Sequence, residues 1–282
     1  EILDNDPDKH VKDEDSTYVG LEEVAEIISL IPLQTSQLDE VHTAVTSSSG
    51  NGYDEEYTMK HLFESPGAGV GDEQTRSAEA YDRPLRELIE DQVRKMHMTR
   101  SGEDGLDPDL FLDELMKSDI QIYWPFSENW DGESLPVITF DPEDGSEKNF
   151  GYRMVMEDDG SRRVEEVVVD EAMAEVEPVW VINRNSDAGY ATLEMLRREH
   201  PDWGEGGGNI IIKPKSASGQ SRSLILKDFK MNRNYDTWFA GASEFFVKVG
   251  AVEDFTASTE AELRLYTPAV TDFMIVVKRS QK

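Results

Sequence analysis

Asn183, Asn185 and Asp187 place side-chain oxygen atoms at alternate positions of the segment NRNSDAGYATLE, and Glu194 closes that segment. These four residues match positions 1, 3, 5 and 12 of a calcium-binding loop of the EF-hand type. Calcium takes about six to eight oxygen ligands, which alternate loop residues can direct inward while a glutamate binds bidentately. The spacing therefore predicts a calcium site formed by Asn183, Asn185, Asp187 and Glu194.

The same segment has a second interpretation that needs no ion. Position 1 of the loop is Asn183 rather than aspartate, and position 6 is Ala188, where the sharp turn favours glycine. In the alternative, Asn183 ends a strand, Asn185 lies in a turn and Asp187 caps the following helix. Both interpretations place the segment at a junction between a strand and a helix.

Three tryptophans lie in loop-like sequence and are predicted to bind a ligand: Trp130 in ENWDG, Trp203 in HPDWGEG and Trp238 in YDTWFAG. An aromatic face is a large apolar surface with a polarised π system, against which a sugar ring can pack. Trp124 and Trp180 lie within strand-like runs instead, so these two are predicted to be core residues.

The sequence contains no HExxH, GxSxG or Walker motif. Its histidines are isolated along the chain, and no pair has the i, i+4 spacing of a helical metal site. A glycosidase needs only two suitably placed carboxylates, but the acidic side chains are too numerous for a pair to be selected. Catalytic residues are therefore not assigned, and a non-enzymatic role is favoured.

The composition is strongly acidic, with 59 aspartates and glutamates against 28 lysines and arginines and a formal net charge of −31. Such a chain repels phosphate backbones and anionic membrane surfaces, so nucleic acid is not expected as a partner. The absence of cysteine excludes disulfides and thiolate chemistry. No apolar run approaches the roughly 20 residues that span a bilayer. The polar, acidic residues that follow Glu1 are typical of a chain whose leader has been removed.

The N-terminal part of the chain is predicted to be helical. Residues 1–17 are expected to be disordered, and residues 18–118 to form a small helical region. Apolar residues recur at helical spacing in 21–31 and 85–96, and Asp107 before Pro108 is typical of a helix start. The compositions of Thr46–Gly52 and Ser65–Asp72 predict loops.

Residues 119–282 show short runs of β-branched and aromatic residues separated by turns. An α+β fold is expected, in which the helical region precedes a β-sandwich-like domain with one inserted helix at 188–199. Glu143–Ser146 and Asp158–Ser161 contain the Asp-Gly pair of tight hairpins. The predicted strands are 120–124, 136–140, 150–156, 164–170, 178–183, 209–213, 223–231, 244–249, 262–267 and 272–278.

The segments QIYWPFSENWDG, EPVWVINRNSDAGY and YDTWFAGASEFFVKVG resemble exported or lipid-anchored envelope proteins of Bacteroidetes-type bacteria. The resemblance covers the C-terminal two-thirds of the chain. It implies export to the periplasm, the outer membrane surface or the extracellular space, and a lipidated cysteine ahead of Glu1. The resemblance implies no particular activity.

Two functions from different classes follow. The first is a non-enzymatic cell-envelope or surface module that binds a protein or glycan through the β-rich domain and its loop tryptophans. The alternative is a carboxylate-dependent hydrolase of polysaccharide or peptidoglycan, which would need a cleft with two carboxylates at glycosidase spacing. These patterns leave the oligomeric state open.

Overall fold

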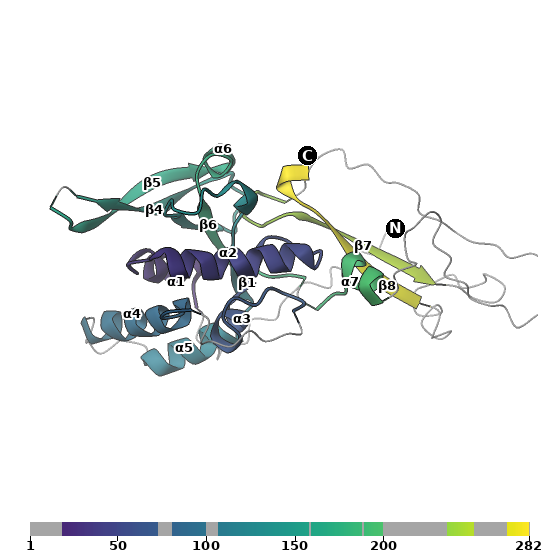
Figure 1. Cartoon of the computed structure of the whole chain (residues 1–282), viewed down its shortest axis with the longest axis horizontal. Helices are drawn as coiled ribbons and strands as arrows, with labels where there is room; N and C mark the ends of the chain where they lie inside the picture. Colours follow the sequence, from purple (N-terminus) through teal and green to yellow (C-terminus); the bar gives the residue numbers. More distant parts are fainter. Residues whose placement is uncertain are drawn as a thin grey trace, which may run out of the picture.

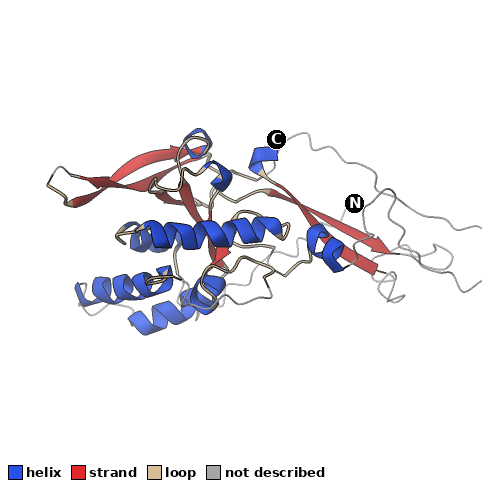
Figure 2. Ribbon diagram, in the orientation of Figure 1, coloured by secondary structure: helices blue, strands red, loops and turns tan. Residues whose placement is uncertain are grey.

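A computed structural model describes residues 19–72, 81–99, 107–157, 159–187, 189–199, 236–250 and 270–281. Its elements are helices, one six-stranded mixed sheet and one two-stranded sheet (Figure 1, Figure 2). The α+β class is therefore confirmed. Within these ranges, no helix combines the length and apolar character needed to cross a membrane.

The large sheet has the strand order β1-β2-β6-β3-β4-β5. Neighbouring strands are antiparallel except for β3 and β6, which run parallel. Its bounds are β1 Glu56–Thr58, β2 Ile120–Tyr123, β3 Val137–Phe140, β4 Lys148–Met156, β5 Arg162–Asp170 and β6 Val179–Arg184. All but β1 overlap predicted strands, with bounds that differ by one or two residues at an end.

Both predicted hairpin turns are confirmed. The turn between β3 and β4 contains Gly145 with φ +82°, and the turn between β4 and β5 contains Gly160 with φ +82°. Glycine adopts this left-handed region without the steric cost that a Cβ brings. The Asp-Gly pairs thus set the register of the three strands at one end of the sheet.

Helices cover one face of the six-stranded sheet. They are α1 (Leu21–Ser29), α2 (Thr35–Gly50), α3 (Met59–Glu64), α4 (Leu85–Thr99) and α5 (Pro108–Lys117). In Figure 2, α1 and α2 lie between the sheet and the row formed by α4 and α5. The apolar residues of these helices share one core with alternate strand residues such as Ile122, Trp124, Trp180 and Ile182. Trp124 and Trp180 are core residues, as predicted.

The opposite face of the sheet packs against α6 (Glu171–Ala174) and the turn that contains Trp238 and Phe239. That turn leads into β7 (Ser243–Gly250), which pairs antiparallel with β8 (Val270–Val277). The pair extends away from the large sheet, with α7 (Leu193–Glu199) beside it (Figure 1). Short 3-10 turns η2 (Ser127–Asn129) and η3 (Arg279–Gln281) complete the described elements.

One predicted loop is wrong: Thr46–Gly50 is the C-terminal part of α2. The apolar period of Leu38, Val41 and Val45 continues to Ser48, which is fully buried despite its polar side chain. A capping box fixes the start of the helix, because Gln34 and Gln37 each accept a hydrogen bond from the other's backbone amide. Tertiary packing therefore overrides the low helix propensity of three consecutive serines.

The predicted boundary at residue 118 falls between α5 and β2, and one core contains residues from both sides of it. β1, from the N-terminal part, is also an edge strand of the large sheet. Helices rather than a second sheet cover one face, so the β-sandwich stays a prediction. The expected disordered segment 1–17 and the predicted strands 209–213, 223–231 and 262–267 lie outside the described residues.

The predicted loop Ser65–Asp72 is confirmed, and its central glycine lies against the backbone of α2. A Cβ atom at Gly69 would lie 2.5 Å from the Ala44 carbonyl oxygen and closer still to the Ser48 amide nitrogen. Gly69→Ala should therefore lower the free energy of unfolding by about 2 kcal/mol, since the loop must move off the helix. Gly20→Ala is the control, because Gly20 has open space around its Cα atom. Gly132→Ala would not serve, because Gly132 has a positive φ that alanine adopts only with strain. In chemical denaturation, equal losses in Gly69→Ala and Gly20→Ala would contradict this packing.

Candidate functional site

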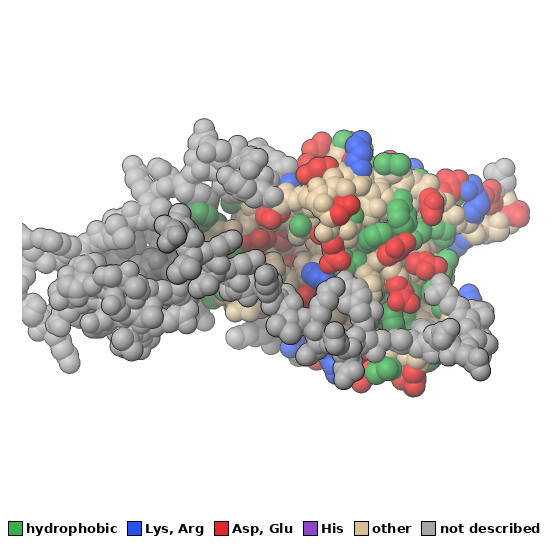
Figure 3. Space-filling view, turned by 180° about the vertical axis from the view of Figure 1, so that it is seen from behind, with side chains coloured by type: hydrophobic (Ala, Val, Ile, Leu, Met, Phe, Trp, Pro, Cys, Tyr) green, Lys and Arg blue, Asp and Glu red, His purple; other side chains and the backbone are tan. Residues whose placement is uncertain are grey.

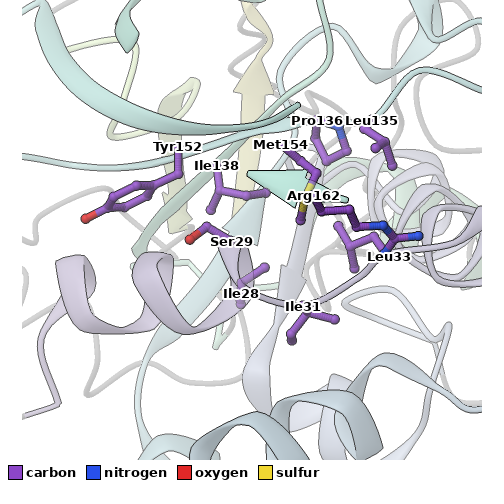
Figure 4. A pocket seen from close by; sticks show the side chains of 10 residues that line it. All are labelled: Ile28, Ser29, Ile31, Leu33, Leu135, Pro136, Ile138, Tyr152, Met154 and Arg162. Carbon is purple, nitrogen blue, oxygen red and sulfur yellow. The ribbon is translucent and has the colours of Figure 1, made fainter. Parts of the chain in front are cut away.

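A small apolar cavity lies between α1 and the sheet (Figure 4). Its volume of about 10 Å³ is close to the minimum that one water molecule needs. The side chains of Ile28, Ile31 and Ile138 point into it together with Met154. The cavity is a packing defect between helix and sheet and is too small for an organic ligand.

A second, open hollow has a volume of about 470 Å³, which lies within the range of small-molecule sites. It forms where the start of β4, the end of β5, α6, the Trp238 turn and η3 come together. We call it the polar hollow, and its lining residues are Glu147, Lys148, Asp170, Glu171, Ala172, Asp236, Trp238 and Arg279.

An ion pair and the hydrogen bonds of Arg279 fix the positions of residues that line the polar hollow. Lys148 and Asp170 are cross-strand neighbours on β4 and β5, and Lys148 Nζ lies 2.9 Å from Asp170 Oδ2. That contact, with the hydrogen bond from the Met173 amide, lowers the pKa of Asp170 below its ordinary value. Arg279 is buried and donates hydrogen bonds to the carbonyl oxygens of Asp236 and Gly241, both at 2.9 Å. The turn that lines the hollow is thus fixed by η3.

The predicted ligand-binding tryptophans do not form one platform. Trp238 lines the polar hollow, but its indole is only 1% exposed and donates from Nε1 to the Glu147 carbonyl oxygen at 3.0 Å. Trp130 lies on the other face of the sheet, with ring centroids 5.1 Å from His42 and 5.3 Å from Trp124. Trp203 lies outside the described residues. Trp238 can therefore form part of the base of the polar hollow, but it offers no exposed face on which a sugar ring could stack.

A third feature is buried and acidic. Four carboxylates converge where the segment before β1, β1 itself, the loop after β6 and the start of β7 meet. We call them the acidic cluster: Asp54, Glu56, Asp187 and Glu244. Asp54, Glu56 and Asp187 are each no more than 3% exposed, and Glu244 is half-buried.

Strand alternation explains why Glu56 points inward. Tyr57 enters the helix-covered core, so its neighbour Glu56 faces the opposite side of the sheet, in register with Tyr123. Asn185 lies beside it and donates from Nδ2 to Glu56 Oε2 at 2.9 Å and to Gln121 Oε1 at 2.6 Å. Asn183 occupies the register position opposite Gln121 on the same face.

Backbone amides orient Asp54. Its Oδ1 accepts a hydrogen bond from the Glu55 amide at 2.9 Å, and its Oδ2 accepts one from the Ala242 amide at 2.6 Å. The second bond ties the segment before β1 to the segment before β7. Asp54 thereby connects two parts of the chain that are distant in sequence.

Burial and mutual repulsion raise the pKa of Glu56, Asp187 and Glu244. Burial, followed by the charges of Asp187 and Asp54, raises the pKa of Glu56 well above its ordinary value. Burial and then Asp54 raise the pKa of Asp187 to about 6. Burial and then Asp187 and Asp54 raise the pKa of Glu244 to about 8. Groups in this state take up protons or cations readily.

The carboxyl groups of Glu56 and Asp187 form a hydrogen bond with each other when one of them is protonated. Asn183 Oδ1 is buried and has no hydrogen-bond partner among the described residues. The basic side chain in this region, Lys278, places Nζ 3.3 Å from Glu55 Oε1 instead. Among the described residues, no ion pair includes a member of the acidic cluster, and no group of three or more acidic or histidine side chains is placed to hold a metal ion.

The predicted calcium ligands are partly brought together. Asn183, Asn185 and Asp187 lie at or beside the acidic cluster, whereas Glu194 on α7 lies against Gly52 and pairs with Arg197 at 3.5 Å. Asp187 does not cap the following helix. That helix begins at Leu193, and Thr192 Oγ1 accepts the Met195 amide hydrogen bond at 3.2 Å.

Sequence reasoning missed Asp54, Glu56 and Glu244 as members of this cluster. Asp54 and Glu56 precede Asp187 by more than 130 residues and Glu244 follows it by 57, and acidic residues are frequent everywhere. The three residues of β1 carry no periodic pattern, and Glu56 is buried only because both faces of the sheet are covered at this point.

The face seen in Figure 3 carries many more acidic than basic side chains, as the net charge of −31 requires. Fold and sites together define an α+β protein with an open polar hollow and a separate buried carboxylate cluster. Comparison with known protein families, curated proteins and solved structures finds no match to this chain.

Proposed function

We propose that the chain is a non-enzymatic module of an exported envelope or surface protein, and that it binds a glycan in the polar hollow. The observation that carries the proposal is the lining of that hollow. Carboxylates and cations together line a volume of about 470 Å³, whose lining also includes Trp238. Sugar hydroxyl groups both donate and accept hydrogen bonds, so they match such a mixed lining.

The charges of the polar hollow select among glycans. Four carboxylates line it, from Glu147, Asp170, Glu171 and Asp236, against two cations, from Lys148 and Arg279. Arg279 is already engaged by backbone carbonyl oxygens, which leaves the carboxylates dominant. Neutral sugars and sugars that bear an amine are therefore the preferred ligands, and uronic or sialylated glycans are disfavoured.

Binding should be measured by calorimetry with neutral, amino-sugar and anionic oligosaccharides, after a glycan array has selected the oligosaccharides. Glu171→Gln, Asp236→Asn and Lys148→Gln should each weaken binding about tenfold or more, since each removes a charge-assisted hydrogen bond. Lys117→Gln on α5 is the matched control, because Lys117 is exposed and pairs with Asp113 outside the hollow. Its affinity should stay within about twofold of wild type.

Three outcomes would count against the proposal. Unchanged affinity in all three hollow variants would place the ligand elsewhere on the chain. Capture of a specific protein, lost in the same variants, would favour a protein partner. Cleavage of the oligosaccharide during the assay would favour the alternative function, a carboxylate-dependent hydrolase.

A further inference from the structure

The two faces of the β4–β5 hairpin differ in chemistry, because residues that lie opposite one another in an antiparallel ladder share a face. One face carries mainly apolar side chains, from Phe150, Tyr152, Met154 and Met156 on β4 and from Arg162, Val164, Glu166 and Val168 on β5. The outer half of the opposite face carries ion pairs, of Arg153 with Glu177 and of Arg163 with Glu157, both at 2.6 Å. The apolar face turns toward the helices, since Phe150 and Tyr152 pack against the core that the helices share with the sheet.

The helices leave much of this apolar face uncovered. The hairpin extends past the end of α1, so α1 covers the face only near the start of β4 (Figure 1). Met156 is 54% exposed near the tip of the hairpin, and Val168 is 66% exposed on the outer strand. Leu135 is 37% exposed and lies beside Met154 and Arg162 at the small cavity (Figure 4). We call this surface the apolar shelf, and its residues are Leu135, Tyr152, Met154, Met156, Val164 and Val168.

Acidic side chains border the apolar shelf. Burial raises the pKa of Tyr152 to about 12, with further contributions from three carboxylates close to its hydroxyl group. These are Glu22 and Glu26 on α1 and Glu166 on β5. Among the described residues, neither Glu22 nor Glu166 belongs to an ion pair. Arg162 brings a positive charge to the same face, but negative charge predominates around the apolar centre.

We propose that the apolar shelf is a docking surface for another protein, which contacts it through a segment of apolar residues flanked by lysine or arginine. Exposed apolar surface that is rimmed by polar groups is typical of protein-binding sites. The apolar side chains of the segment would cover Met154, Met156 and Val168, while its basic side chains would pair with Glu22 and Glu166. Complementary charges of this kind speed association and select among partners.

This surface is separate from the site of the proposed glycan binding. The polar hollow lies on the other face of the sheet, where α6 and the Trp238 turn pack, and its lining includes none of the shelf residues. The two proposals can therefore fail independently.

The same charges argue against two other occupants of the apolar shelf. A symmetric dimer through this surface would bring Glu22, Glu26 and Glu166 of both copies together. Like charges in an interface are costly, and Arg162 offsets only part of them. An anionic membrane surface is repelled by these carboxylates and by the net charge of −31. A basic protein segment is the occupant that the charges favour.

The test starts from a phage-displayed library of random peptides, selected on the full chain. The selected peptides should combine aliphatic or aromatic residues with lysine or arginine, and acidic residues should be rare in them. Fluorescence anisotropy then measures the affinity of one selected, labelled peptide for wild type and variants. The affinity should fall as the salt concentration rises, since salt screens the ion pairs.

A matched pair of valine variants tests the apolar contact. Val168→Thr keeps the shape and strand propensity of valine but replaces a methyl group with a hydroxyl group, so it should weaken peptide binding about fourfold. Val176→Thr is the control, because Val176 is 79% exposed and follows α6, outside the apolar shelf. The control should bind the peptide within about twofold of wild type.

A matched pair of charge reversals tests the electrostatic contact. Glu166→Lys should weaken peptide binding about tenfold or more, because it replaces an attraction with a repulsion. Glu175→Lys is the control, since Glu175 is exposed at the end of α6 and should leave the affinity within about twofold of wild type. All four substituted residues are exposed, so the variants should fold, and circular dichroism checks that they do.

Several results would overturn the proposal. Selection of acidic peptides, or of none that bind saturably, would do so before any variant is made. Unchanged affinity in both Val168→Thr and Glu166→Lys would show that the peptide binds elsewhere. Loss of peptide binding in Glu171→Gln would place the peptide in the polar hollow. A dimer in light scattering that Met156→Ser abolishes would assign the apolar shelf to self-association instead.

Discussion

Glu40→Ala should lower the free energy of unfolding by about 4 kcal/mol, because two buried donors each lose their acceptor at a cost of about 1–3 kcal/mol. Glu40 lies on α2 and is fully buried. Its Oε1 accepts the Tyr57 hydroxyl hydrogen bond at 2.9 Å, and its Oε2 accepts the Leu85 amide at 2.7 Å. One carboxyl group therefore connects α2 to β1 and to the start of α4. Urea denaturation followed by tryptophan fluorescence measures the loss.

Glu40→Gln is the conservative comparison, since the amide oxygen can still accept from Leu85. We expect it to lose less than half as much stability as Glu40→Ala. Burial raises the pKa of Glu40 in the folded state above its ordinary value of 4.5. The folded state then binds more protons than the unfolded state, so the contribution of Glu40 to stability rises as the pH falls toward 4.5.

The stability difference between wild type and Glu40→Gln should therefore grow in favour of wild type on acidification, since glutamine does not titrate. A difference that stays constant with pH would show that the pKa of Glu40 is the same in both states. If Glu40→Ala lowers the free energy of unfolding no more than Glu40→Gln does, the hydrogen bonds from Tyr57 and Leu85 to Glu40 do not stabilise the fold as proposed.

Trp124→Ala should lower the free energy of unfolding by about 3–5 kcal/mol, the usual cost of removing a buried tryptophan side chain. Trp124 is 1% exposed, and its ring centroid lies 5.6 Å from that of Trp180 and 5.3 Å from that of Trp130. His42 on α2 completes the group, at 5.6 Å from Trp124. Removal of this ring leaves a cavity between α2, β2 and β6.

Leu110→Ala on α5 provides the control for Trp124→Ala, because Leu110 is 45% exposed and should cost well under 1 kcal/mol. Both variants should be measured by guanidinium denaturation with circular dichroism, which does not depend on the removed fluorophore. Comparable losses in the two variants would show that the aromatic group does not stabilise the junction of α2 with the sheet.

Much of the sheet could be predicted because its signals are local. The strands from β2 to β6 contain β-branched and aromatic runs, and Asp-Gly pairs mark the turns at Gly145 and Gly160. Pro108 after Asp107 likewise marks the start of α5, where Asp107 Oδ1 accepts the Asp109 amide hydrogen bond. Each of these features depends on neighbours within a few residues.

The elements that were missed depend on distant contacts. α2 continues through a serine run because Ser48 packs into the core, and β1 has only three residues, EYT, which carry no periodic pattern. The order β2-β6-β3 also requires two strands that are separated in sequence by the β4–β5 hairpin to lie side by side. Local propensity contains no information about such pairings.

The sites were only partly predictable for the same reason. Asn183, Asn185 and Asp187 lie close together in sequence, and alternate spacing identified them. Glu56 and Glu244 join them only because β1 and β7 approach the loop after β6. The polar hollow likewise combines the β4–β5 hairpin with the Trp238 turn and Arg279. Only Trp238 could be nominated from its local sequence.

The two outer strands of the large sheet bear on how copies of this chain interact with one another. β1 has three residues, too few to template a long intermolecular ladder. β5 is longer, with the sequence RRVEEVVVD, and pairs only with β4 among the described strands. Charged side chains fill its first half, and edge charges oppose strand addition by another molecule. These charges oppose edge-to-edge aggregation of the sheet. Because this repulsion is electrostatic, it weakens as salt screens the charges.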